Sequence, residues 1–243
     1  MSPTLLDQIR STAKPLGYVL HSFPDEQMVC SCMFCAPCLY YNYCYHAPIS
    51  LSLYNAGLLF AVSHDPLELA VLAMNWIQPP SGVLDPPQVE ALAEWQKTSP
   101  HKFLALDDTR QNDGRLRALQ RAFDILNRLF FKGTFNLLGL RWMVTTGYEK
   151  SRALTFNHRY LGKVTIELNQ QLHSLHSRHP LRVRLINTLL HEMMHAFLFT
   201  YSCYAPPNPS LCGDVVRCKQ LGDANLGQHY HGRAWLWLAI TVE

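Results

Sequence analysis

The spacing of apolar residues in the second half of the chain predicts three helices and a small sheet. Apolar side chains recur at helical spacing from Leu116 to Phe131, and Gly133 follows as a C-terminal stop signal. Further helices are predicted from Pro180 to about Phe199 and from Gly232 onward. Between the first two helices, three stretches rich in β-branched and aromatic residues predict a short antiparallel meander: Leu138 to Thr145, Ala153 to Asn157 and Lys163 to Leu168.

The first half of the chain has a different character. Its segment from Cys30 to His46 is rich in cysteine and aromatic residues. The polar run from Asp107 to Gly114 is typical of a linker. We therefore predict an N-terminal region of unknown role over residues 1–115 and a second domain over residues 116–243. In the first region two helices are predicted: His64 to Ile77 and Val89 to Trp95.

The composition limits the classes of function. With 48% hydrophobic residues among 243, the chain can bury a sizeable core, which excludes disorder as its dominant state. Only 16% of the residues are charged, but twelve histidines and eight cysteines offer ligands for transition metals. Residues 1–115 hold six Lys and Arg against eleven Asp and Glu, whereas residues 116–243 hold fifteen against seven. The basic second half is therefore a candidate for DNA binding, and solvated surface charge is the alternative interpretation.

The sequence favours an intracellular protein outside the membrane. No segment approaches the roughly 20 uninterrupted apolar residues of a membrane-spanning helix, and the nearest one, Ile49 to Val62, is broken by polar residues. The first twenty residues contain no readable secretory signal. We therefore expect a nuclear or cytoplasmic protein with mostly reduced thiols.

A metal-binding motif lies on the helix predicted from Pro180. His191, Glu192 and His195 form the pattern HExxH. On a helix, two histidines four residues apart lie on one face, so both can bind one zinc ion while the glutamate projects at a water molecule beside it. At about 100° per residue, this helix has a polar stripe and an opposite apolar side. The stripe contains Arg184, Asn187, Thr188, His191 and His195, and the apolar side contains Leu185, Leu189, Met193 and Ala196.

The class of a zinc site depends on its third ligand. The metzincin class is excluded, because Leu198 and Tyr201 stand where its extended motif has glycine and histidine. A glutamate ligand is disfavoured, because the only glutamate after the motif is Glu243. We favour His231, which opens an apolar helix whose packed residues would hold it rigidly. The candidates that remain are Asp214, Asp223, His229 and His231, with His229 as the alternative to His231.

The motifs of the second half, taken in order, resemble the SprT-like metalloproteases, the family that includes the DNA-protein crosslink protease Spartan. The similarity covers about residues 116–243 and is carried by LQRAFDILNRLFFKGTFN, LRWMVTTG, TIELN, LINTLLHEMMHAFLF and HGRAW. It implies a zincin-like α+β fold, with zinc on His191, His195 and His231 and with Glu192 as the catalytic base. It also implies cleavage of proteins on or near DNA.

The cysteines offer a weaker second site. Cys35 and Cys38 have the spacing of a zinc knuckle, but a well-separated second pair is missing. A reduced, half-buried segment is therefore the favoured interpretation over a zinc site formed by Cys30, Cys32, Cys35 and Cys38. A loop is predicted from Tyr201 to Gly227, and its unevenly spaced thiols are weak evidence for a structural site: Cys203, Cys212 and Cys218.

These features together predict a zinc-dependent endopeptidase. Glu192 is expected to take a proton from water and to deliver it to the leaving amine. Lys163 to Leu168 is expected to pair with an extended protein substrate by backbone hydrogen bonds. The oxyanion partner is left open among Tyr201, Tyr230 and Arg233. The alternatives are a non-catalytic DNA- or protein-binding module that keeps zinc for its structure, and a hydrolase of another substrate class.

Overall fold

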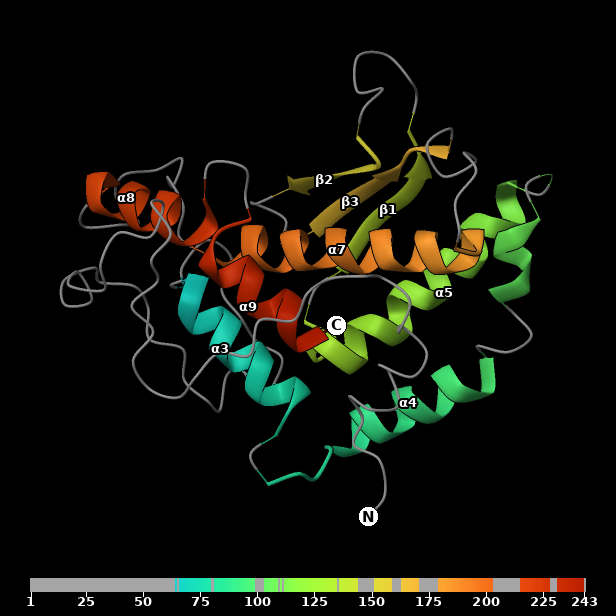
Figure 1. The fold of residues 1–243 in the computed structure, drawn as a ribbon, viewed down its shortest axis with the longest axis horizontal. Coiled ribbons are helices and arrows are strands. Elements are labelled where there is room, and N and C mark those ends of the chain that lie inside the picture. The colour runs from blue at the N-terminus through green and yellow to red at the C-terminus, as the bar shows by residue number, and fades with distance from the viewer. Residues whose placement is uncertain are drawn as a thin grey trace.

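The computed structural model describes the chain from residue 64 onward, with gaps (Figure 1). Several sequence predictions lie outside this part, among them the cysteine-rich segment Cys30–His46 and the side chains of Asp214, His229 and Tyr230. The described residues are 64, 66–79, 81–98, 103–108, 110, 112–134, 136–143, 151–158, 163–170, 179–202, 215–227 and 231–242.

The predicted helices are confirmed, with changes at their ends. They are α3 (Pro66–Ile77), α4 (Pro86–Thr98), α5 (Asn112–Phe131), α7 (Leu181–Tyr201) and α9 (Arg233–Val242). The predicted linker is shorter than expected, because residues 112–114 form the first turn of α5 and Asp107 ends the short 3₁₀ helix η2 (Phe103–Asp107). None of the helices described is long and apolar enough to span a membrane.

One helix lies inside the predicted loop. Helix α8 (Val215–Leu226) occupies the second half of the stretch expected to be irregular from Tyr201 to Gly227. Its sequence, VVRCKQLGDANL, contains an internal glycine and begins with two β-branched valines, so local helix propensity is weak. It ends at Gly227, whose φ of 76° lies in the left-handed region that favours glycine. Packing against α3 and α9 supplies the stability that the local sequence lacks.

The small sheet is mixed, so the predicted antiparallel meander is wrong. Strands β1 (Asn136–Trp142), β2 (Ala153–His158) and β3 (Lys163–Leu168) lie in the order β1-β3-β2. β3 pairs parallel with β1 and antiparallel with β2. The physical reason is burial on both faces of β3, where Val164, Thr165 and Ile166 are successive buried residues, as expected of a central strand. Both edges of β3 are therefore occupied, and it cannot pair with a substrate as the sequence suggested.

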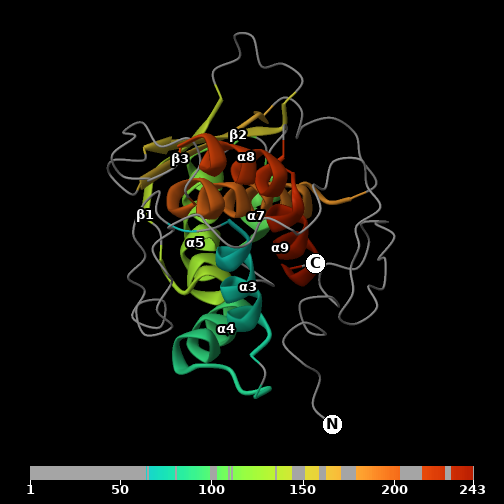
Figure 2. The same ribbon diagram turned by 90° about the vertical axis from the view of Figure 1, so that its left-hand side faces the viewer.

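Helix α7 lies between the sheet and the other helices. Figure 1 shows the three strands on one side of α7 and helices α3, α5 and α9 on its other side, and Figure 2 shows the same layers from the end. The apolar side predicted for α7 is confirmed, because Leu185, Leu189, Met193 and Ala196 are fully buried in the core. The polar residues of α7, among them His191 and His195, therefore lie on its other side.

Residues on both sides of position 115 share one core. Leu69, Ala70 and Ala73 of α3 are fully buried in the same cluster as the apolar residues of α5, α7 and α9. The indole of Trp76 also donates a hydrogen bond of 3.1 Å to the Leu129 carbonyl of α5. Helix α3 is therefore part of the packing around the second half, while the domain boundary at residue 115 stays a prediction.

A residue from the predicted linker caps helix α7. Pro180 precedes the helix and provides no side-chain cap. Instead, the carboxylate of Asp107 accepts hydrogen bonds from the Arg182 backbone N–H, at 2.9 Å, and from the Arg182 guanidinium, at 2.8 Å. An acidic group at a helix N-terminus satisfies an unpaired N–H and interacts favourably with the helix dipole. η2 thus fixes the beginning of the helix that contains HExxH.

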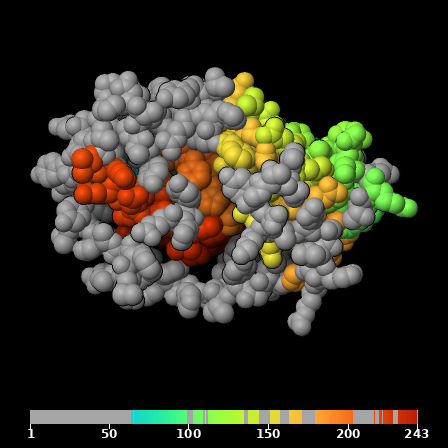
Figure 3. All heavy atoms as spheres, turned by 90° about the horizontal axis from the view of Figure 1, so that it is seen from above, coloured from blue at the N-terminus to red at the C-terminus, as the bar shows by residue number. Residues whose placement is uncertain are grey.

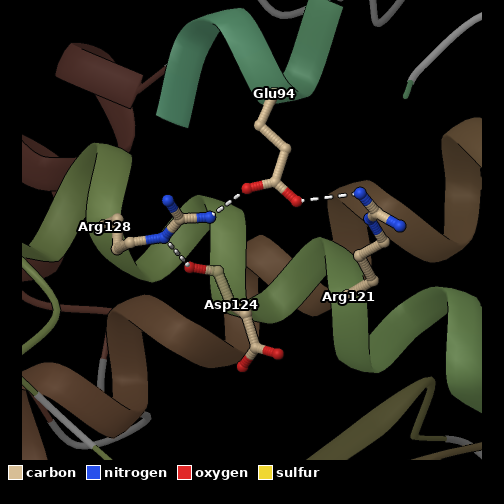
Figure 4. Close-up of polar contacts among 4 residues, drawn as sticks. All are labelled: Glu94, Arg121, Asp124 and Arg128. Carbon is tan, nitrogen blue, oxygen red and sulfur yellow. Dashed lines mark hydrogen bonds and ion pairs between the residues drawn. The ribbon is translucent and has the colours of Figure 1, made fainter. Parts of the chain in front are cut away.

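An ion-pair cluster joins α4 to α5. The carboxylate of Glu94 binds Arg121 at 3.0 Å and also Arg128, and Arg128 donates to the Asp124 carbonyl of its own helix (Figure 4). The hydrogen bond from Arg128 lowers the pKa of Glu94 below its ordinary value, and partial burial opposes this shift. Because the folded state favours the ionised form, Glu94 stabilises the protein above its ordinary pKa, and this contribution disappears as the pH falls through the lowered pKa.

We expect Glu94→Gln to lower the free energy of unfolding at pH 7 by no more than about 1 kcal/mol, since the three side chains are 32% to 42% exposed. At a second, acidic pH low enough to protonate the carboxylate, the difference from the wild-type protein is expected to shrink. Urea denaturation at both pH values measures it. Glu90→Gln, at an exposed position of the same helix, is the control. An equal difference at both pH values would contradict the assignment.

Candidate metal centre

Helix α7 and the turn before α9 bring three histidine rings together. The Nε2 atom of His195 lies 3.2 Å from that of His191 and 3.1 Å from that of His231, and the remaining pair is 3.1 Å apart. Within the described part of the chain, these residues form the group that could hold a metal ion. Asp223, an exposed residue of α8, is not part of it.

The chemistry of these three nitrogens fits a zinc ion. Tetrahedral zinc bonded to imidazole nitrogens at about 2.0–2.1 Å keeps them about 3.3 Å apart, close to the spacing found here. Burial lowers the pKa of His191 to about 4 and that of His195 to about 3, and the neighbouring histidines contribute to both shifts. Both rings are therefore neutral at pH 7, which is the protonation state that metal binding requires.

Aromatic rings enclose the histidines. Trp235, in the first turn of α9, has its ring centroid 4.8 Å from that of His191, 5.6 Å from that of His195 and 4.6 Å from that of His231. Phe199 stacks on His195 at 5.6 Å with an interplanar angle of 16°. These contacts restrict the orientation of the imidazoles, which is the role that surrounding groups play at metal sites. Sequence reasoning had expected the apolar residues of this helix only to hold His231 by packing.

The position of His231 depends on the helix that the sequence did not predict. The backbone N–H of Gly232 donates to the Leu226 carbonyl, at the end of α8, at 2.7 Å. A Cβ atom on Gly232 would lie 2.5 Å from the carbonyl oxygen of Asn225, closer than side-chain carbons approach in proteins. A glycine is therefore required where the chain passes against α8, directly after the third histidine.

Glu192 lies beside the histidines and faces the sheet. It is 7% exposed, and its carboxylate accepts a hydrogen bond of 2.6 Å from the hydroxyl of Thr155 on β2. Burial raises the pKa of Glu192 to about 7, although the Thr155 hydrogen bond works in the opposite direction. A carboxyl group with a pKa near neutrality is suited to both accepting and returning a proton. Sequence reasoning missed Thr155, because nothing in the local pattern connects it to a residue 37 positions away.

The candidates for the oxyanion partner separate in the structure. The Tyr201 hydroxyl donates to the Thr134 carbonyl, and the Tyr201 ring packs on Phe197 within the core, so this tyrosine is turned away from the histidines. Arg233 lies over the ring of Trp237, at 5.6 Å from its centroid. It stays a candidate because it begins α9 two residues after His231.

The face of α7 that carries the motif is partly open. Seen from the side of the sheet, atoms of α7 remain visible between those of the sheet and those of the C-terminal helices (Figure 3). His231 is exposed and His191 is half-buried, whereas His195 is 8% exposed. The group therefore combines a buried side, formed by α7, with a side that is accessible to solvent.

Comparison with known proteins identifies one part of the chain. The model described as SprT-like family matches residues 119–206. This segment contains most of α5, the sheet and α7, so it includes His191, Glu192 and His195 but not His231. Neither a search of curated proteins nor a search of solved structures found a match.

We expect His231→Ala to reduce zinc affinity by more than the roughly 10–100-fold typical of changes outside the ligand set, because it removes a ligand. Zinc retained after dialysis against a competing chelator, measured by elemental analysis, checks this. His179→Ala, at a histidine that precedes α7, is the control. Zinc binding that is equal in the two variants would contradict the ligand set.

We expect Gly232→Ala to lower zinc affinity at least about tenfold without touching a ligand, because the added methyl group pushes the turn away from Asn225 and displaces His231. Gly139→Ala on β1 is the matched control, since a Cβ atom there has its nearest neighbour at an ordinary 3.9 Å. The same competition assay measures both variants. Unchanged affinity in Gly232→Ala would show that this close approach does not position the histidine.

Proposed function

We propose that the protein is a zinc-dependent endopeptidase, on the basis of the three converging imidazoles and of the match of residues 119–206 to the SprT-like family. The observation that carries the proposal is a buried carboxylate next to a cluster of three imidazole nitrogens. Three protein ligands leave one position of a tetrahedral ion for water or substrate, which is typical of catalytic zinc. His191, His195 and His231 are the proposed ligands, and Glu192 is the proposed base.

In the proposed reaction, the three histidines hold the metal ion and Glu192 transfers the proton. A zinc ion held by the three histidines supplies Lewis acidity to the scissile carbonyl and to the attacking water. Glu192 accepts the proton of that water through its carboxylate and afterwards delivers it to the nitrogen of the leaving amine. Its raised pKa, about 7, supports both steps near neutral pH. The rings of Trp235 and Phe199 limit water around the histidines and hold their orientation.

The proposed substrate is an extended peptide lying along β2. β3 is paired on both sides, whereas the outer edge of β2 has no partner strand in the described sheet. β2 packs on α7, and Thr155 connects it directly to Glu192. A peptide that adds to this edge by backbone hydrogen bonds gains affinity with little dependence on its side chains. This replaces the expected role of Lys163–Leu168 in substrate binding.

DNA-associated proteins are the substrate class that we propose. Two observations support this class. Residues 119–206 match the SprT-like family, and residues 116–243 contain fifteen Lys and Arg but only seven Asp and Glu. Binding of DNA phosphates by basic side chains weakens steeply as salt is added, because counterions are released. Cleavage of histone and of casein, each with and without single-stranded DNA at several salt concentrations, separates this class from a general protease.

Two alternative functions, a zinc-stabilised binding module and a hydrolase of another substrate class, would give different results in these experiments. A zinc-stabilised binding module requires a closed, four-ligand site, whereas the described residues offer three ligands. It would bind DNA or protein with no cleavage in the presence of zinc. A hydrolase of another class would form no peptide products from histone or casein, although it would still hydrolyse its own substrate.

We expect Glu192→Gln to retain zinc and to cleave protein substrates about 10²–10⁴ times more slowly, because the amide cannot accept the proton. Peptide products from histone, analysed by mass spectrometry beside zinc content, measure the effect. Wild-type protein treated with a chelator is the parallel control and is expected to be inactive. A fully active Glu192→Gln protein would refute the mechanism.

A further inference from the structure

We propose that Thr155 is a positioning residue that holds the carboxylate of Glu192 in place for proton transfer, an inference that rests on the proposed function. Its Oγ1 atom lies 2.6 Å from Oε2 of Glu192 and 3.2 Å from the backbone oxygen of the same residue. Within the described part of the chain, Thr155 is the only residue that donates a hydrogen bond to this carboxylate.

The two distances show which bond dominates. A hydroxyl has one proton to donate, and the shorter contact, at 2.6 Å, is with the carboxyl oxygen, which therefore receives the main hydrogen bond. The longer contact keeps the hydroxyl close to the backbone of α7. Thr155 therefore fixes the carboxylate relative to the helix that also carries His191 and His195. A long glutamate side chain without this contact has more rotamers available, so a smaller share of molecules would have the base in place.

The strand gives Thr155 a fixed position of its own. Thr155 pairs with Ile166 in the antiparallel register of β2 and β3, and β2 packs on α7. Side chains alternate along a strand, so Thr155 faces α7 while its neighbour Phe156, 40% exposed, faces away. A shift of the strand by one residue would turn the hydroxyl to the other face, and the buried residues of β3 oppose such a shift.

The test compares Thr155→Val with Thr155→Ser in the zinc-loaded full chain. Valine keeps the shape and removes the hydroxyl, whereas serine keeps the hydroxyl and removes the methyl group. For Thr155→Val we expect unchanged zinc content, a KM within about twofold of the wild-type value and a kcat lower by about 10–100-fold. Thr155→Ser is expected to retain most of kcat. A merely structural role would instead lower zinc content or folded fraction, and serine would not restore kcat.

A second measurement does not depend on cleavage. Thr155→Val, Glu192→Ala and the double variant are unfolded by denaturant at one fixed concentration of free zinc, which keeps ligand stabilisation constant. If the hydroxyl binds the carboxylate, Thr155→Val destabilises the wild-type background more than it destabilises the Glu192→Ala background. Equal destabilisation in both backgrounds would overturn the inference.

The outcomes separate this inference from the proposed function. An active wild-type protein whose Thr155→Val variant has an undiminished kcat would overturn the role of Thr155 and leave the endopeptidase standing. A wild-type protein that binds zinc and cleaves neither histone nor casein would overturn the endopeptidase itself. Coupling in the unfolding cycle together with a selective loss of kcat in Thr155→Val supports both.

Discussion

The structure depends on a single helix that must satisfy two different neighbours. Helix α7 buries one side among apolar residues of the other helices and leaves its opposite side beside the strands. Because the period of a helix is fixed, burial of Leu189 and Met193 determines where His191 and His195 emerge. The capping of its first turn by Asp107 and the packing of its apolar side thus place the two histidines of α7.

The sequence predicted what depends on local spacing. The boundaries of β3 agree with the structure at both ends, and the two sides of α7 follow from periodicity alone. The order of the strands did not follow, because pairing is decided by contacts between distant segments. Only the completed core shows that Val164 to Ile166 is buried on both faces. Helix α8 was missed for the same reason, since its stability comes from packing against α3 and α9 and not from its composition.

In the candidate site, too, the features that depend on local spacing were predicted and those that depend on distant contacts were not. The HExxH spacing indicated two ligands and a base, and the apolar helix after His231 indicated a third. The hydrogen bond from Thr155 and the close approach at Gly232 connect segments that are far apart in the sequence, and no local pattern marks either of them. The raised pKa of Glu192 belongs to this group as well, because burial is a property of the folded protein.

The residues matched by the family do not contain the whole candidate site, so they are not a suitable fragment for testing activity. The matched residues 119–206 contain two of the proposed ligands and the proposed base, but the third ligand lies beyond them. His231 is held by α8 and α9, and α9 packs on α3, which precedes the matched segment. A protein that begins near residue 116 would lose α3 and with it one of the helices on which α9 packs. Loss of activity in such a protein would reflect a displaced ligand and not the removal of a regulatory segment, so the role of the N-terminal region is better tested by removing only residues before His64.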